Sequence, residues 1–338
     1  MNNPPIRQRD LRGPRPTRPG RRLAHTRTHH AALAARLTPR DRWLLRMLHE
    51  HRVLTSTQIR QLAFPSTRSA NQRLLELYRW RLLDRFQPFL TRGSAPMHYV
   101  LDVAGAAVLA AEHGLDIKDL AYRREQAIGI AHSLRLAHTV GVNAWFTTLV
   151  AHARHHAHAQ LTTWWSETRC ARLFGDLVRP DGYGRWASHG HLVEFFLEYD
   201  LGTEPTTVVA GKLSGYAALA AATDIATPVL IWIPSTRRET AVRRALDTTW
   251  RRLDNPETVP VATAAADLCS DADPAADVWL PLGNDSRRRR LADLSTAWQH
   301  LDDPPTTGSS AADPGVSTQG PGHLSVPDPM PPELKDGR

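Results

Sequence analysis

The chain has 338 residues, which is enough for about two ordinary domains and for a buried core. Its 42 Lys and Arg outnumber its 34 Asp and Glu, and the net charge of +8 is typical of proteins that bind a polyanion. The two cysteines, Cys170 and Cys269, exclude a disulfide framework and a CxxC metal site, so we expect a cytoplasmic location.

The charge is unevenly distributed along the chain. Residues 1–92 contain 20 Arg and five acidic residues, a net charge of +15, whereas residues 93–338 come to −7. The N-terminal side is therefore predicted to face the polyanion. The longest uncharged apolar run, residues 103–111, is far shorter than the roughly 20 residues of a membrane-spanning helix, so no membrane partner is expected.

Both ends of the chain have the composition of disordered segments. Residues 1–36 contain nine Arg and five Pro with few large apolar residues, which predicts a disordered basic arm. Residues 301–338 are rich in Pro and Gly and predict a disordered tail. The sequence between them predicts two domains, at residues 37–113 and 124–300.

Local signals predict three short helices at the start of the first domain. Thr38 is an N-cap followed by Pro at the first helical position, and Thr55 caps a second helix. After a break at Pro65, apolar residues at helical spacing predict a third helix over about residues 67–80.

A hairpin follows these helices. Residues 82–90 and 97–101 are typical of strands, the loop between them contains Gly93 and Pro96, and an Ala-rich helix at 103–113 closes the domain. Three helices and a hairpin in about 75 residues predict a winged helix-turn-helix that binds DNA.

The third helix is the predicted reader of base edges. Its exposed positions supply bidentate donors and acceptors for bases and charges for phosphates. The predicted DNA-contacting residues are Thr67, Arg68, Asn71, Gln72 and Arg79 on this helix, Arg40 and Arg42 on the first helix, and Arg92 at the hairpin tip. The alternative is an ordinary solvated face on a protein–protein module.

The second domain has the pattern of an α/β (α+β) fold. A long helix over about residues 124–155 precedes three strands, and helices then alternate with strands. The predicted strands are 161–167, 177–186, 191–200, 227–233 and 259–264, with helices at 205–222 and 239–252. This order predicts a mixed sheet, with an antiparallel meander and a crossover to the fourth strand.

Acidic residues on the second and third strands resemble the PD…(D/E)xK pattern of the restriction-endonuclease-like superfamily. Asp181 follows Pro180, and Glu198 and Asp200 end the third strand. The resemblance implies an αβββαβ fold whose carboxylates hold Mg²⁺, which activates water. Asp200 stands where the pattern has its Lys, and Lys212 on the following helix is the nearest replacement.

The predicted catalytic set is therefore Asp181, Glu198, Asp200 and Lys212, with the three carboxylates as metal ligands. The alternative is structural, since Asp181 can cap the Pro-Asp-Gly turn and Glu198 can pair with a nearby Arg.

The full order of segments resembles the replication-relaxation family of actinobacterial plasmids and integrative elements. After the basic arm, the winged helix and a His-containing helix come RPDG at 179–182, FFLEYDLGTE at 195–204 and GKLSGY at 211–216. The resemblance covers roughly residues 38–255. It implies a role in the DNA metabolism of a mobile element, in plasmid replication, relaxation or transfer.

Two functions remain open on the sequence alone. The first is a protein that docks double-stranded DNA through its winged helix and cuts it with Mg²⁺ at the nuclease-like domain. The second is a non-enzymatic transcriptional regulator or replication accessory factor, without a cofactor, whose degenerate nuclease fold serves assembly. A homodimer and replication or transfer proteins are the expected protein partners.

A histidine-rich segment, HARHHAH at 152–158, ends the long helix. His152 and His156, or His155 and His158, share one helical face, which is metal-ligand spacing. Because the sequence places no Cys or carboxylate nearby, the pattern favours a solvated helix end.

Overall fold

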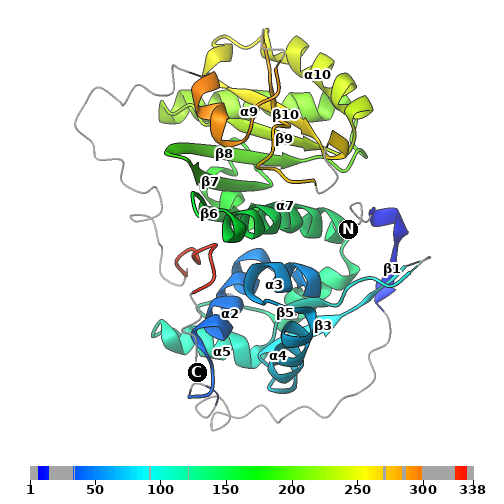
Figure 1. The fold of residues 1–338 in the computed structure, drawn as a ribbon, viewed down its shortest axis with the longest axis vertical. Coiled ribbons are helices and arrows are strands. Elements are labelled where there is room, and N and C mark those ends of the chain that lie inside the picture. Colours follow the sequence, from blue (N-terminus) through cyan, green and yellow to red (C-terminus); the bar gives the residue numbers. More distant parts are fainter. Residues whose placement is uncertain are drawn as a thin grey trace. The chain divides into compact units, whose positions relative to one another are not determined.

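The structure, a computed structural model, describes residues 7–14, 33, 35–90, 93–120, 122–268, 272–283, 287–298 and 324–332 (Figure 1). The chain divides into two compact units, and the boundary between them falls between Thr147 and Thr148. The first also includes residues 324–332. No helix among the described residues is long and apolar enough to span a bilayer.

The first unit contains the predicted helices and hairpin strands. Its elements are α2 (Pro39–His51), β2 (Leu54–Thr55), α3 (Ser56–Ala63), α4 (Thr67–Arg79), β3 (Leu83–Phe86), β5 (His98–Leu101) and α5 (Val103–Glu112). β5 pairs antiparallel with both β2 and β3, so a short three-stranded sheet closes against the helices.

Capping boxes begin two of these helices, as the sequence predicts. The Thr38 hydroxyl accepts from the Asp41 N–H at 3.2 Å, and the Asp41 carboxylate accepts from the Thr38 N–H at 2.8 Å. Thr55 and Gln58 make the same reciprocal pair at the start of α3. Each box satisfies backbone donors that a helix leaves unpaired at its first turn.

Part of the predicted disordered arm is ordered. β1 (Leu11–Pro14) pairs antiparallel with β4 (Pro88–Leu90). Just before it, the Gln8 side chain donates to the Ser133 carbonyl at 3.3 Å and accepts from the Ala137 N–H at 2.9 Å. Residues 11–14 of the predicted basic arm therefore form a strand, because an open hairpin edge pairs with their backbone.

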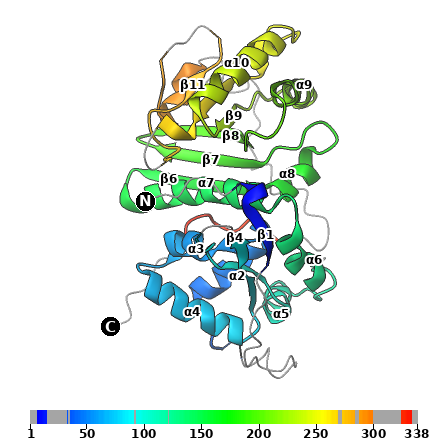
Figure 2. The ribbon, with the colours of Figure 1, turned by 90° about the vertical axis from the view of Figure 1, so that its right-hand side faces the viewer.

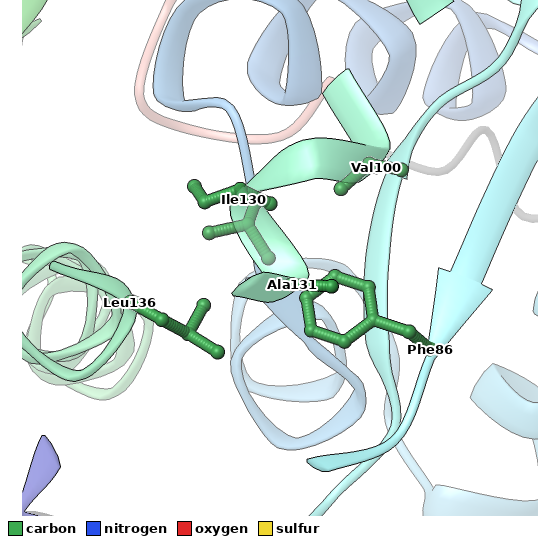
Figure 3. Packing of buried hydrophobic residues seen from close by; sticks show 6 residues of the cluster. Phe86, Val100, Ile130, Ala131 and Leu136 are labelled. Atoms are coloured by element: carbon green, nitrogen blue, oxygen red, sulfur yellow. The ribbon is translucent and has the colours of Figure 1, made fainter. Parts of the chain in front are cut away.

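The start of the predicted long helix is broken and packs in the first unit. α6 (Arg124–Gly129) is followed by η2 (Ile130–His132) and a turn before α7 (Leu136–His155). Ile130, Ala131 and Leu136 join one core cluster (Figure 3). The cluster also holds Val53, Phe86 and Val100. The unit thus extends beyond the predicted domain end at residue 113.

Asn143 on α7 ties this segment to the end of α2 and the residues that follow it. Its side-chain amide donates to the carbonyls of His51 at 3.2 Å and Val53 at 2.7 Å. Gln58 donates to the Val140 carbonyl at 2.9 Å. These side-chain bonds to backbone carbonyls join α7 to α2 and α3.

The predicted disordered tail also contains an ordered segment. In residues 324–332, Leu324, Pro327 and Pro329 are buried. The Trp43 indole N–H on α2 donates to the Asp328 carbonyl at 2.7 Å. The first unit therefore binds this C-terminal strap, residues 324–332 of the predicted tail, through apolar burial and one side-chain hydrogen bond.

We expect Trp43→Phe to lower the free energy of unfolding by about 1 kcal/mol, the usual contribution of one such hydrogen bond. Deleting residues 321–338 should cost more, because it also exposes the apolar surface that the strap buries. In the deleted chain Trp43→Phe should have little further effect. Urea denaturation of the four chains measures this coupling, and full additivity of the two changes would contradict the hydrogen bond. Deleting only residues 333–338 is the control.

The second unit is built on one six-stranded sheet among the described residues, in the order β11-β10-β9-β8-β7-β6. Its strands are β6 (Ala159–Ser166), β7 (Gly182–Ser188), β8 (His191–Tyr199), β9 (Val229–Ile233), β10 (Val261–Ala265) and β11 (Leu280–Pro281). The first three are antiparallel, and β9 runs parallel to β8. The predicted meander and crossover are confirmed.

Two helices connect the parallel strands. α9 (Thr206–Thr223) links β8 to β9, and α10 (Thr236–Trp250) links β9 to β10. They pack against each other, as Figure 2 shows. Parallel neighbours require such crossovers, so α9 is held beside the end of β8.

One helix in this unit differs from the sequence prediction. α8 (Glu167–Phe174) begins at the predicted end of a strand, and the Ser166 hydroxyl caps it by accepting from the Arg169 N–H at 3.2 Å. β7 starts only at Gly182, later than predicted, because Pro180 has no N–H for a sheet ladder. Asp181 therefore lies at the entrance to β7.

Candidate functional site

Asp181, directly before β7, and Glu198 on β8 lie at the same end of the β7–β8 pair. The Asp181 N–H donates to the Leu197 carbonyl at 3.0 Å, and the Asp181 carboxylate accepts from the Tyr199 N–H at 2.8 Å. These bonds bracket Glu198 along the chain. Asp181 is 5% exposed and Glu198 is 3% exposed, so two carboxylates are buried side by side.

Two side chains from α9 reach Glu198. The Lys212 ammonium lies 2.6 Å from Oε2, and the Tyr216 hydroxyl donates to Oε1 at 2.5 Å. Lys212 and Tyr216 are four residues apart and so lie on one face of the helix. Asp181, Glu198, Lys212 and Tyr216 are called the carboxylate cluster below.

The electrostatics of the carboxylate cluster follow from burial. Burial raises the pKa of Glu198 to about 7, with a further increase from the Asp181 charge, while Lys212 and Tyr216 act in the opposite direction. Burial alone would lower the pKa of Lys212, but the Glu198 and Asp181 carboxylates outweigh it and raise this pKa. The cluster therefore holds one ammonium between two acidic groups.

Asp200, the third predicted metal ligand, is engaged elsewhere. Arg238 on α10 forms a two-pronged ion pair with its carboxylate, and the Gly202 N–H donates to Oδ1 at 2.7 Å. Among the described residues, Asp181, Glu198 and Asp200 do not bring ligand atoms within 4.8 Å of one another as a set of three. The predicted three-carboxylate site is not assembled, because Arg238 holds Asp200.

Glu167 is a further acidic residue at this site that the sequence analysis missed. It begins α8, and one of its carboxylate oxygens lies within 4.8 Å of one of Asp181. Its position directly after a capping Ser was the available signal, since Ser-Glu is typical of a helix start. Asp181 therefore has two acidic neighbours, Glu198 on β8 and Glu167 on α8.

A pH dependence of stability follows from the raised pKa of Glu198. Between its ordinary value of 4.5 and about 7, the folded protein keeps a proton that the unfolded chain has lost. The free energy of unfolding should therefore fall as the pH rises through this interval. We expect Glu198→Gln to weaken this decline. Thermal unfolding of both proteins from pH 4.5 to 8 checks this, and identical slopes would contradict it.

The outer face of α4 contains the predicted base-reading residues. Ala70, Leu74, Leu77 and Tyr78 are buried, which turns the opposite side outwards. The exposed residues include Thr67, Arg68, Asn71, Gln72 and Arg79. Within the described residues, no hydrogen bond or ion pair occupies the side chains of Arg68, Asn71 and Gln72.

The other predicted DNA-contacting residues are placed differently. The Arg40 guanidinium lies 4.2 Å from the ring centroid of Phe64 and donates to the Ala63 carbonyl at 3.3 Å. Arg42 forms an ion pair with Glu112. Both are therefore occupied within the unit, and Arg92 lies outside the described residues.

The geometry defines a mixed α/β protein with an exposed polar helix in one unit and a buried carboxylate–lysine cluster on the sheet of the other. A family profile described as replication-relaxation matches residues 45–236, more than half of the chain. The chain belongs to the replication-relaxation family. No curated protein and no solved structure matches it. The matched range includes the outer face of α4 and the whole carboxylate cluster.

Proposed function

We propose that the chain binds double-stranded DNA in the replication or relaxation of a plasmid or other mobile element, and that its first unit is a winged helix-turn-helix. The family supports the setting. The order α2-β2-α3-α4-β3-β5, with β2, β5 and β3 in one sheet, supports the assignment of the unit. In such a unit α4 takes the place of the helix that enters the major groove.

The observation that carries this proposal is the free polar face of α4. Arg68, Asn71 and Gln72 are exposed and have no partners within the described residues. Arg is suited to the O6 and N7 acceptors of guanine, and Asn and Gln to the edge of adenine. The +15 charge of residues 1–92 adds sequence-independent attraction to phosphates.

Binding of the full chain to duplex DNA tests the proposal. In a fluorescence anisotropy titration, we expect the affinity for a random duplex to fall steeply between 50 and 200 mM salt, because phosphate contacts release counterions. Absence of binding at 50 mM salt would contradict the proposal. The protein should bind a DNA site selected from a random pool more tightly than it binds the random duplex. An excess of random duplex should displace little of the selected site from the protein.

A second activity is proposed for the carboxylate cluster, Mg²⁺-dependent hydrolysis of phosphodiester bonds. Asp181 has a Glu167 carboxylate oxygen within 4.8 Å and the buried Glu198 on the adjacent strand, and carboxylate oxygens are the hard ligands that Mg²⁺ prefers. Burial and the nearby Asp181 charge raise the pKa of Glu198, and a divalent cation would offset the negative charge of this pair. When bound, the ion would activate water and polarise the phosphate. Lys212 would stabilise the negative charge that develops.

The non-enzymatic alternative has its own supporting contacts. Both Glu198 oxygens are engaged, by Lys212 and Tyr216, and Asp200 is paired with Arg238. Under this alternative, the paired side chains of the carboxylate cluster have a structural role, which is to hold α9 against the sheet. Under this alternative the second unit contributes assembly or partner binding, and loss of Glu198 affects stability alone.

A further inference from the structure

The outer face of α10 carries a row of arginine side chains. Val242 and Leu246 on this helix are buried, which turns its opposite side outwards. Arg237, Arg244 and Arg251 follow one another at intervals of seven residues, so they lie on that opposite side, about 10 Å apart along the helix axis. All three are exposed. These three residues are called the arginine row below.

The arginine row is largely free of internal partners. Arg237 and Arg244 make no hydrogen bond or ion pair within the described part of the chain. Arg251 pairs through Nε with Asp247 one turn earlier, and its side chain is 65% exposed, so this pair contributes little to stability. Arg243, nearer the sheet, instead donates to both backbone carbonyls of β11, at 2.7 and 2.8 Å. The fold therefore uses Arg243 but leaves the row available to a ligand.

The row gives α10 a charge opposite to that of the surrounding sequence. Residues 236–252 contain six Arg and two acidic residues, a net charge of +4, whereas residues 93–338 as a whole come to −7. One of the two acids, Glu239, is buried and paired with Arg288. The neighbouring helix α9 contains no acidic residue. The outer side of α10 is thus a locally positive surface, which attracts phosphate groups.

The row begins at the edge of the sheet that holds the carboxylate cluster. β8 and β9 are parallel neighbours, so both strands end at the same edge. Glu198 lies at the end of β8, and α10 begins three residues after β9 ends. Arg238, in the first turn of α10, binds Asp200 and donates to the Glu204 carbonyl, both in the segment that follows β8. A polyanion bound along the row therefore lies next to this segment.

We propose that the arginine row is a second DNA-binding surface, which contacts phosphates of the DNA backbone and positions a duplex beside the carboxylate cluster. This inference rests on the proposed function, because it takes the same polyanion as its ligand. The row is about 21 Å long, and over that length each strand of a duplex has about six phosphates. Each guanidinium can therefore meet a phosphate of its own. Such contacts carry no sequence information, unlike those proposed for α4.

The salt dependence of DNA binding tests the row. The logarithm of the binding constant falls with the logarithm of the salt concentration, with a slope of about −0.9 for each phosphate contacted. Replacing all three arginines of the row by Gln should therefore make the slope less steep by about 2.7. Replacing the same three by Lys should preserve the slope, because a phosphate contact of this kind needs only the positive charge. Fluorescence anisotropy of the full chain with a random duplex measures the slopes.

A matched control removes the same charge from other parts of the second unit. Arg154, Arg287 and Arg290 are exposed and lie outside α10, and replacing them by Gln should leave the slope unchanged. Circular dichroism checks that each variant is folded.

Two results would overturn the arginine row while leaving DNA binding intact. One is an unchanged slope in the chain with Gln at the row, and the other is an equal change in the control, since total charge would then explain both. A parent chain that does not bind the duplex at all would overturn the proposed function together with this inference.

Discussion

Replacing Arg68 and Gln72 by Ala is expected to reduce affinity for the preferred DNA site by about 10- to 100-fold for each bidentate pair of hydrogen bonds that is removed. Both side chains are exposed on α4 and unpaired within the described residues, so their removal disturbs little else. Binding to random duplex should fall much less, because that binding depends on phosphates. Anisotropy titrations with the selected site and a scrambled duplex measure both effects.

Arg42→Ala is the matched control for this prediction. It removes the same charge from the same unit, but Arg42 is already paired with Glu112. We expect little change in the ratio of specific to random binding. If the Arg68 and Gln72 variant lost equal affinity for both duplexes, these residues would contact phosphates rather than base edges.

The second large effect concerns the carboxylate cluster. Asp181→Asn and Glu198→Gln should each reduce Mg²⁺-dependent nicking of supercoiled plasmid by at least about 100-fold, because each removes a charged ligand of the proposed ion. Lys212→Ala should cost about 10²- to 10³-fold by removing stabilisation of the developing charge. DNA affinity should remain as in the parent chain. Gel electrophoresis of the plasmid over time gives the rates.

Asp200→Asn tests whether the loss of nicking is specific to the proposed ligands or follows from removing any nearby carboxylate. Arg238 holds Asp200, so this change should lower stability while nicking persists. Equal loss of nicking in Asp200→Asn and Asp181→Asn would contradict the proposed set of ligands. A parent chain inert with both Mg²⁺ and Mn²⁺ would favour the non-enzymatic alternative.

Local signals in the sequence predict much of the fold. Thr38 and Thr55 each begin a helix through a capping box, which depends on residues only three positions apart. The alternation of apolar strands and helices after residue 159 likewise predicts the mixed sheet. Asp181, Glu198 and Lys212 converge as their order on a strand, a strand and a crossover helix suggests.

The features that sequence reasoning misses depend on contacts between distant segments. The short spacing between Asp200 and Glu198 predicts that they act together, yet Arg238 on α10 determines where Asp200 lies. β1 at residues 11–14 pairs with a strand more than 70 positions away. Asp273 meets His152 in the same manner. No local pattern of hydrophobicity or capping encodes such pairings.

Site-specific photocrosslinking from α4 to DNA is the most direct test of the proposal that this helix docks duplex DNA. A photoreactive amino acid at Asn71 should crosslink efficiently to a duplex containing the selected site, and an excess of the same unlabelled duplex should suppress the product. The same group at Lys118, exposed after α5, is the comparison and should crosslink weakly. No product from position 71, or equal yields from both positions, would contradict docking through α4.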